Sequence, residues 1–284
     1  MLAFITSLRH PDNSADYARV EQLLSETIGS VTAQTSDDYV VIIVGNKHPS
    51  VALPDRAKFV KVGFPAPAPP TGPRTAREPF VWDKGTKIGV GLLAAREYNP
   101  DFVMIFDADD FVSNRLAAYV NENLDSAGWV ISNGWMYSKD RNAIRPIKDF
   151  NRTCGTSFII PFAAYDVPLS VPITFTQDEV GSYFEENLQH ILGAHRDAVE
   201  WHLSKGRTLT TLPFRGAVYH VDTGENHSGK GLQGLALPLS NRFRREFSIP
   251  SSRGKIPTLW RSAGPTPIRE SASGAMRRLR NRGR

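Results

Sequence analysis

The order of apolar and polar residues along the first part of the chain predicts alternating strands and helices. Short apolar runs bounded by polar residues are typical of buried strands. Such runs occupy residues 2–6, 39–44, 59–62 and 102–106. Segments in which apolar residues recur every three or four positions are typical of amphipathic helices. Such segments span residues 17–32 and 86–98. The alternation predicts an α/β fold with a mostly parallel central sheet and helices on both faces.

The second part of the chain carries weaker patterns of the same two kinds. Helical spacing continues over residues 112–124 and, as one long or broken helix, over 184–203. Short apolar runs predict further strands at residues 129–132, 157–160, 209–212 and 217–221. Six prolines between Pro65 and Pro79 exclude a helix or a central strand there, so we expect an exposed loop over 65–79. A loop of this length is either a mobile insertion or a lid over a site, and we favour the lid.

The cysteine content and the lack of long apolar runs indicate the compartment in which the protein works. The single cysteine, Cys154, cannot form an intrachain disulfide, which favours a reducing compartment. The first residues lack the pattern of a signal peptide, and no apolar run reaches the ~18 residues of a membrane span. We therefore expect a cytoplasmic protein.

Charge is distributed unevenly between the body and the end of the chain. Residues 240–284 contain twelve Lys and Arg against two acidic residues, a net charge of +10. The other 239 residues contain 22 basic and 27 acidic residues, a net charge of −5. We expect a catalytic domain over residues 1–235 and a basic tail over 236–284. The tail is either a disordered solvated end or an attachment to an anionic partner. Of such partners we expect the inner face of a membrane, contacted peripherally, and no nucleic acid.

The strongest chemical signal is the run Asp107-Ala108-Asp109-Asp110, which follows the predicted strand at 102–106. Open α/β sheets bind ligands at the carboxyl ends of their strands, where this run would lie. Carboxylate oxygens suit Mg²⁺ or Mn²⁺, and either ion would neutralise a diphosphate. The alternative is that these residues cap the helix that follows.

Two segments that precede this run strengthen its interpretation as a ligand site. Residues 30–35 read S-V-T-A-Q-T, and residues 84–89 read K-G-T-K-I-G, about twenty positions before D-A-D-D. Three such motifs in this order resemble the inverting family 2-type bacterial glycosyltransferases of the GT-A fold, over roughly residues 1–230. The resemblance implies a GT-A-like nucleotide-diphospho-sugar transferase. Such an enzyme moves a sugar from a UDP- or GDP-type donor to a glycan or lipid-linked acceptor, with Mn²⁺ or Mg²⁺, in polysaccharide synthesis.

The resemblance also implies roles for individual residues. Those expected beside the nucleotide-sugar are Thr6, Ser7, Arg9, Lys84, Lys87 and Asp107. Asp109 would coordinate the metal, with Asp110 as a further candidate. The chain departs from the family after the second strand, where Asn46 stands near the position of an aspartate that reads the base. An amide both donates and accepts hydrogen bonds, so Asn46 is a candidate for that contact.

The catalytic base and the later ligands lie where the family pattern weakens. Inverting transfer needs a base near the acceptor hydroxyl, and His195 or Asp197 stands opposite the family's acidic pair. His220, which ends an apolar run, is a candidate metal ligand, and His227 is a second one. Trp135 is a candidate stacking surface for a sugar.

Two other functions fit parts of the sequence. A phosphatase of the haloacid dehalogenase-like class also uses a strand that ends in D-x-D, and Ser132 could supply its second element. The position of the acidic strand after a full β/α region, and the absence of a later G-D-x-x-x-D motif, argue against it. A non-catalytic module that binds anionic ligands through the arginine-rich tail is the other alternative.

Overall fold

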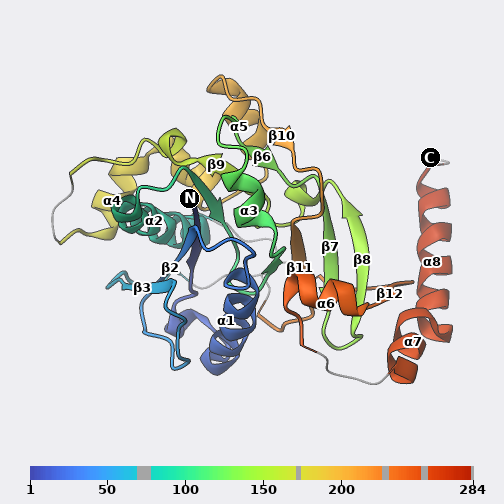
Figure 1. Cartoon of the computed structure of the whole chain (residues 1–284). Coiled ribbons are helices and arrows are strands. Elements are labelled where there is room, and N and C mark those ends of the chain that lie inside the picture. The colour runs from blue at the N-terminus through green and yellow to red at the C-terminus, as the bar shows by residue number, and fades with distance from the viewer. Residues whose placement is uncertain (69–77, 171–173, 226–229, 251–254, 283–284) are drawn as a thin grey trace.

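The computed structural model describes residues 1–68, 78–170, 174–225, 230–250 and 255–282, and the side chains of these except 255–258 and 274–282. Twelve strands within these residues form two sheets (Figure 1). The larger sheet has seven strands in the order β10-β6-β9-β4-β1-β2-β3. These strands are β1 (Leu2–Ser7), β2 (Tyr39–Gly45), β3 (Ala57–Lys61), β4 (Phe102–Ile105), β6 (Trp129–Val130), β9 (Phe158–Pro161) and β10 (Thr210–Thr211).

Only β9 runs against its neighbours in the larger sheet, pairing antiparallel with both β4 and β6. The pairs β1–β2, β1–β4, β2–β3 and β6–β10 are parallel. The expected mostly parallel sheet is therefore confirmed. Its central strands are buried on both faces, which is why they appear in the sequence as continuous apolar runs.

Helices cover both faces of this sheet, as expected. On one face α1 (Tyr17–Val31) and α3 (Leu116–Asn121) pack on a core that includes Phe4 and Met104. On the other face lie α2 (Glu78–Ala95), α4 (Gln177–Phe184) and α5 (Ala198–Ser204), around a core that includes Ile5. Short 3-10 turns occupy Pro11–Asn13, Arg96–Tyr98, Phe150–Arg152 and Phe162–Tyr165, and a π turn occupies Leu188–Leu192.

Three predicted helices have different limits in the structure. The helix expected at 86–98 begins earlier, at Glu78, because Pro79 lies in the first turn, where its missing N–H costs nothing. Residues 112–124 hold the end of strand β5 and the short helix α3. The helix expected at 184–203 is divided into the end of α4, the π turn and α5. Helix α4 stops at Glu185, whose φ of 41° is incompatible with a continued helix.

A second, five-stranded sheet in the order β12-β8-β7-β11-β5 extends the fold. Its strands are β5 (Phe111–Val112), β7 (Asn133–Ser138), β8 (Ala143–Lys148), β11 (Ala217–Val221) and β12 (Leu237–Pro238). Of these only β11 was predicted as a strand. The hairpin of β7 and β8 escaped detection because β7 begins with Asn-Gly and β8 contains Pro146, both poor strand signals.

The last part of the chain contains three helices, α6 (Asn241–Phe247), α7 (Lys255–Ala263) and α8 (Pro265–Arg282). Phe243 and Phe247 of α6 are buried in a third apolar cluster with Phe111 and Tyr137 of the second sheet. Residues 237–249 thus belong to the packed body, although we expected the tail to begin at 236. Helix α7 contacts β12 and β8, and α8 stands at the edge of the molecule (Figure 1).

Candidate active site

The carboxyl ends of β1 and β4 lie side by side because these strands are parallel neighbours. Ser7 ends β1, and the acidic run follows β4 directly. A cleft of about 460 Å³ opens at this edge, where α/β sheets bind their ligands. It is also lined by Phe80, Val81, Asp83 and Lys84 of α2, by residues 153–155, by residues 193–196 and by Tyr219 and Glu225.

The cleft gathers six of the fourteen residues that the sequence singled out. Ser7, Arg9, Lys84, Asp107, Asp109 and His195 all line it. Thr6, Asn46, Lys87, Asp110, Asp197, His220 and Trp135 do not. His227 lies outside the described residues. Pro67 of the expected lid lines the cleft, whereas residues 69–77 of that loop are not described.

Asp107 and Lys84 form an ion pair inside the cleft, with Lys84 Nζ 2.5 Å from Asp107 Oδ1. Burial alone would raise the pKa of Asp107, but the charge and hydrogen bond of Lys84, helped by His195, hold it below its ordinary value. The pKa of Lys84 is raised in turn, because Asp107 outweighs the effect of burial on the ammonium. Both groups are therefore charged at neutral pH.

Gly155 forms the floor between three of these side chains. A Cβ at this position would lie 3.0 Å from Asp107 Oδ2 and 3.3 Å from both His195 Nδ1 and Lys84 Nζ. The glycine therefore lets a carboxylate, an imidazole and an ammonium converge on one point, which a larger residue would obstruct. No local pattern marks this role, because the three side chains come from helix α2, from the turn after β4 and from the segment before α5.

Asp109 is also at the cleft, two residues along the same turn. Burial, together with the charge of Asp107, raises its pKa to about 7, while Arg9 and Lys84 offset part of that effect. Near neutral pH the negative charge of Asp107 thus opposes the ionisation of Asp109 at the edge of the same cleft. A cation between them would relieve that competition.

Asp110 lies behind the cleft and is fully buried. Its carboxylate accepts hydrogen bonds from Cys154 Sγ at 2.9 Å, from Thr156 Oγ1 at 2.5 Å and from the backbone N–H of His220 at 3.1 Å. Burial and the neighbouring charges of Asp109 and Asp107 raise its pKa well above the ordinary value. These bonds tie the acidic turn to β11 and to the segment before β9, so Asp110 serves the architecture of the site.

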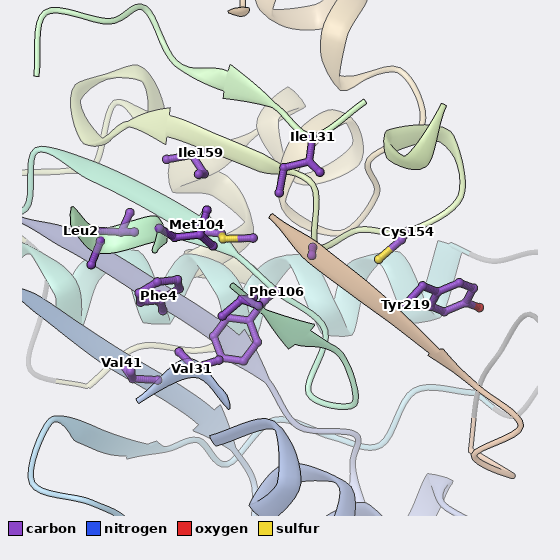
Figure 2. Close-up of a cluster of buried hydrophobic side chains, with 14 of the residues drawn as sticks. Leu2, Phe4, Val31, Val41, Met104, Phe106, Ile131, Cys154, Ile159 and Tyr219 are labelled. Atoms are coloured by element: carbon purple, nitrogen blue, oxygen red, sulfur yellow. The ribbon is translucent and has the colours of Figure 1, made fainter. Parts of the chain in front are cut away.

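Asp107, Asp110 and Cys154 are close enough to share a metal ion, since their ligand atoms lie within 4.8 Å of one another. The chemistry of this set suits Mg²⁺ or Mn²⁺ poorly, because the thiol is a soft ligand. Burial and the charge of Asp110 also raise the pKa of Cys154, which keeps the thiol protonated. Cys154 packs in the main apolar cluster near Tyr219 (Figure 2). Asp107 and Asp109 are the two carboxylates of the acidic run that line the cleft, and both offer hard oxygen ligands.

Arg9 is fixed in the cleft by Glu225, a residue that the sequence analysis missed. Arg9 Nη1 lies 2.6 Å from Glu225 Oε2, and Nη2 donates to the Glu225 carbonyl at 2.6 Å. Glu225 also accepts a hydrogen bond from the backbone N–H of Asp16, ahead of α1. The two residues are 216 positions apart, so only the fold reveals the pair.

The K-G-x-x-K segment proves to have two different lysines. Lys87 is fully buried, and its ammonium lies 2.8 Å from Asp83 Oδ2 and 3.0 Å from the Leu8 carbonyl. It anchors the turn that carries Arg9, instead of facing the cleft. Asn46 is similarly occupied, because its amide donates to the Phe64 carbonyl at 2.7 Å.

The S-V-x-x-Q-T segment stabilises the chain that follows the acidic turn. Ser30 Oγ donates to the Val112 carbonyl and accepts from the Val112 N–H, both at 3.0 Å. The Gln34 side-chain amide donates a hydrogen bond to the Ser113 carbonyl and accepts one from the Ala117 N–H. This motif therefore does not face the cleft, and it supports the acidic turn by holding β5 and the start of α3 against α1.

The remaining candidates lie elsewhere. Asp197 is exposed ahead of α5. His220 is buried and packs against the rings of Phe111 and Tyr137, and burial lowers its pKa to about 3. Trp135 packs edge-on against Phe243 of α6. Ser132, the residue that a phosphatase of the haloacid dehalogenase-like class would need near the acidic turn, is not part of the cleft lining.

No family model matches this chain, and no curated protein matches it in sequence. Solved structures do show similarity in fold. TarS of S. aureus shares 14% identity over 78% of this chain, with a TM-score of 0.41. TarS 1-349 in complex with UDP-GlcNAc shares 14% identity over 82% of this chain, with a TM-score of 0.43. The chain spans 36% and 62% of the lengths of these two structures.

A third similar structure is Rv0371C of Mycobacterium tuberculosis H37Rv in complex with manganese. It shares 11% identity over 87% of this chain and 98% of its own length, with a TM-score of 0.37. At this level of similarity the neighbours do not decide the function, which depends on the residues of the site. Among the described residues, no helix is both long and apolar enough to cross a membrane.

Proposed function

We propose that the protein is a nucleotide-sugar-dependent glycosyltransferase whose donor binds in the cleft beside Asp107 and Asp109. The observation that carries this proposal is the convergence of those carboxylates with Arg9, Lys84 and His195 at the edge shared by β1 and β4. A diphosphate needs positive charge, and Arg9 and Lys84 supply it beside a pair of carboxylates that favour binding of a divalent cation. The resemblance of the S-V-x-x-Q-T, K-G-x-x-K and D-A-D-D motifs supports a sugar as the transferred group.

The divalent ion of this proposal is Mn²⁺ or Mg²⁺, held by Asp109 and Asp107. When bound, it would supply the positive charge that stabilises the leaving diphosphate. Lys84 already neutralises Asp107, so it either remains beside the ion or turns toward a phosphate oxygen. Arg9, fixed by Glu225, presents its guanidinium to the same region and orients the donor.

For the base we favour His195 over Asp197. His195 lines the cleft, whereas Asp197 is exposed outside its lining. A neutral imidazole can accept the proton of an acceptor hydroxyl, as general-base catalysis requires. Direct attack by that hydroxyl on the sugar would invert the anomeric centre. The acceptor that we propose is a hydroxyl of a glycan or a lipid-linked glycan.

Thermal denaturation with UDP, GDP and inorganic phosphate, each with and without Mn²⁺, tests the donor site. A ligand at a hundredfold its dissociation constant stabilises the fold by about 2.7 kcal/mol, which is several degrees in Tm. We expect such a shift with one nucleoside diphosphate in the presence of metal. Stabilisation by phosphate alone, accompanied by release of phosphate from phosphomonoesters, would instead support the phosphatase.

Hydrolysis of a panel of nucleotide-sugars, UDP-GlcNAc included, then identifies the donor. The anomeric configuration of the product, followed by NMR, tests inversion. Replacing His195 with Asn should abolish transfer while preserving the shift in Tm with nucleotide and metal. The matched variant Asp197→Asn should retain activity, and a loss of activity in that variant alone would reassign the base.

A further inference from the structure

Several large apolar side chains are exposed in one small part of the molecule. They belong to the segment around β12 and to the two last helices, and they are Leu235, Leu237, Leu259, Trp260 and Ile268. Trp260 is 68% exposed and Leu259 is 55% exposed. Single exposed apolar residues are ordinary, but a group of them on adjoining elements marks a contact surface.

This surface is held on the body of the protein. The guanidinium of Arg141, which follows β7, donates to the carbonyls of Leu232, Gly234 and Arg261. Across from it, the Gly234 N–H donates to Glu270 Oε2 at 2.6 Å. Helices α7 and α8, called here the C-terminal helix pair, therefore present their exposed side chains from a fixed base.

The helix pair is also strongly basic. Residues 255–282 contain seven Lys and Arg against one acidic residue, a net charge of +6. That single acidic residue, Glu270, is engaged with the Gly234 N–H. Arg261 and Arg269 are exposed directly beside Trp260 and Ile268 in the sequence. Exposed cationic and apolar side chains thus occur together on both helices of the pair.

We propose that the C-terminal helix pair docks the protein on an anionic lipid bilayer. Trp and aliphatic side chains enter the boundary between headgroups and acyl chains, while Lys and Arg pair with lipid phosphates. Leu259 and Ile268 favour a bilayer over a nucleic acid, because aliphatic side chains find no partner along a phosphate backbone. This inference does not depend on the proposed chemistry of the cleft.

The position of the helix pair in the fold is compatible with docking. The pair adjoins β12 and β8, at one end of the second sheet, whereas Tyr219 on β11 lines the cleft nearer the other end (Figure 1). A bilayer at the helix pair would thus leave the cleft open. A lipid-linked acceptor would then reach a transferase that already lies on the same surface.

Sedimentation with vesicles of phosphatidylcholine, with and without 30% phosphatidylglycerol, tests the proposal on the full chain. We expect binding to the anionic vesicles alone, weakened by high salt. Replacing Arg277, Arg278, Arg280 and Arg282 with Gln should lower the partition coefficient about fivefold per arginine. Replacing Trp260 with Ser should lower it about tenfold. The matched control Leu203→Ser, on the exposed side of α5, should have no effect.

A second measurement separates a bilayer from other anionic partners. Lipids brominated on their acyl chains should quench tryptophan fluorescence in the wild type, and Trp260→Phe should lose this quenching while it retains vesicle binding. Binding to anionic vesicles that survives both the arginine and the Trp260→Ser variants would overturn the proposal. Tight binding to RNA without binding to vesicles would overturn it as well.

Discussion

The acidic turn after β4 has two sides, one that lines the cleft and one that is bonded into the interior. Asp107 and Asp109 line the cleft, where Lys84 and Arg9 bring positive charge. Asp110 is fully buried and accepts three hydrogen bonds from the protein itself. Adjacent residues of one motif therefore serve different purposes, since one side is arranged to meet a ligand and the other to hold the turn in place.

The largest effect should come from the buried side. Replacing Asp110 with Ala would leave the Cys154, Thr156 and His220 donors without their acceptor, which should cost about 3 kcal/mol or more in unfolding free energy. Urea denaturation followed by circular dichroism measures this loss. Asp110→Asn retains one carbonyl oxygen and should lose less. Asp109→Asn is the control for the cleft side, and an equal loss in that variant would erase the distinction between the two sides.

The next effect concerns ligand binding by the cleft side. Replacing Asp109 with Ala should remove metal-dependent stabilisation by a nucleoside diphosphate and leave the fold intact. Isothermal titration with UDP and Mn²⁺, or with GDP and Mn²⁺, measures it. Asp197→Ala is the matched control, because that carboxylate lies outside the cleft lining. Unchanged affinity in Asp109→Ala would place the metal elsewhere.

Lys84 should affect nucleotide binding by a smaller amount. Replacing it with Met removes a charged hydrogen bond to the donor or to Asp107, and should weaken nucleotide binding by about tenfold to a hundredfold. Lys87→Met should instead destabilise the fold, because the Asp83 carboxylate would lose its buried partner. If Lys87→Met weakened binding as specifically as Lys84→Met, the assignment of Lys87 to the interior would fail.

The raised pKa of Asp109 predicts that the stability of the fold depends on pH. The pKa of Asp109 is about 7 in the fold against 3.8 in the unfolded chain, so the folded state binds more protons between these values. The contribution of Asp109 should therefore be full below about pH 4 and should fall as the pH rises toward 7. Unfolding free energies measured without metal should fall less steeply over this range in Asp109→Asn than in the wild type.

The smallest expected effect is that of Gly155→Ala. The new methyl group would press on Asp107 and Lys84 at about 3 Å, which these side chains can relieve by a small shift. We expect nearly unchanged stability and a several-fold weaker affinity for nucleotide with metal, measured by titration. Gly206 has a φ of 77°, and a Cβ there would meet no atom within 4 Å, so Gly206→Ala tests whether backbone strain alone produces such a change.

The sequence was most informative where burial is simplest. Strands β1, β2 and β4 are largely apolar and buried, and their parallel order placed the acidic turn at the correct edge. The second sheet was largely missed, because β5 and β12 are two residues long and β8 contains Pro146. The pattern of apolar and polar residues does not reveal such short strands, because they form only when distant parts of the chain supply their partner strands.

The residues of the candidate site were likewise predictable from sequence only in part. Residues next to a strong strand, such as Ser7 and Asp107, could be placed from sequence. Lys87 and Asn46 could not, because a motif position does not reveal whether a side chain faces a cleft or a backbone carbonyl. Glu225 and Gly155 depend on contacts between distant segments, and no local signal marks either of them.

The end of the second sheet has a consequence for solubility. An open strand edge offers unpaired backbone groups to other chains, and it is a common origin of aggregation. Here the outermost strand, β12, is only two residues long, and Pro238 has no N–H to offer. Helix α7 contacts the same strand. An intruding strand would thus find too short a template, so we expect concentrated solutions of this protein to resist edge-to-edge assembly at β12.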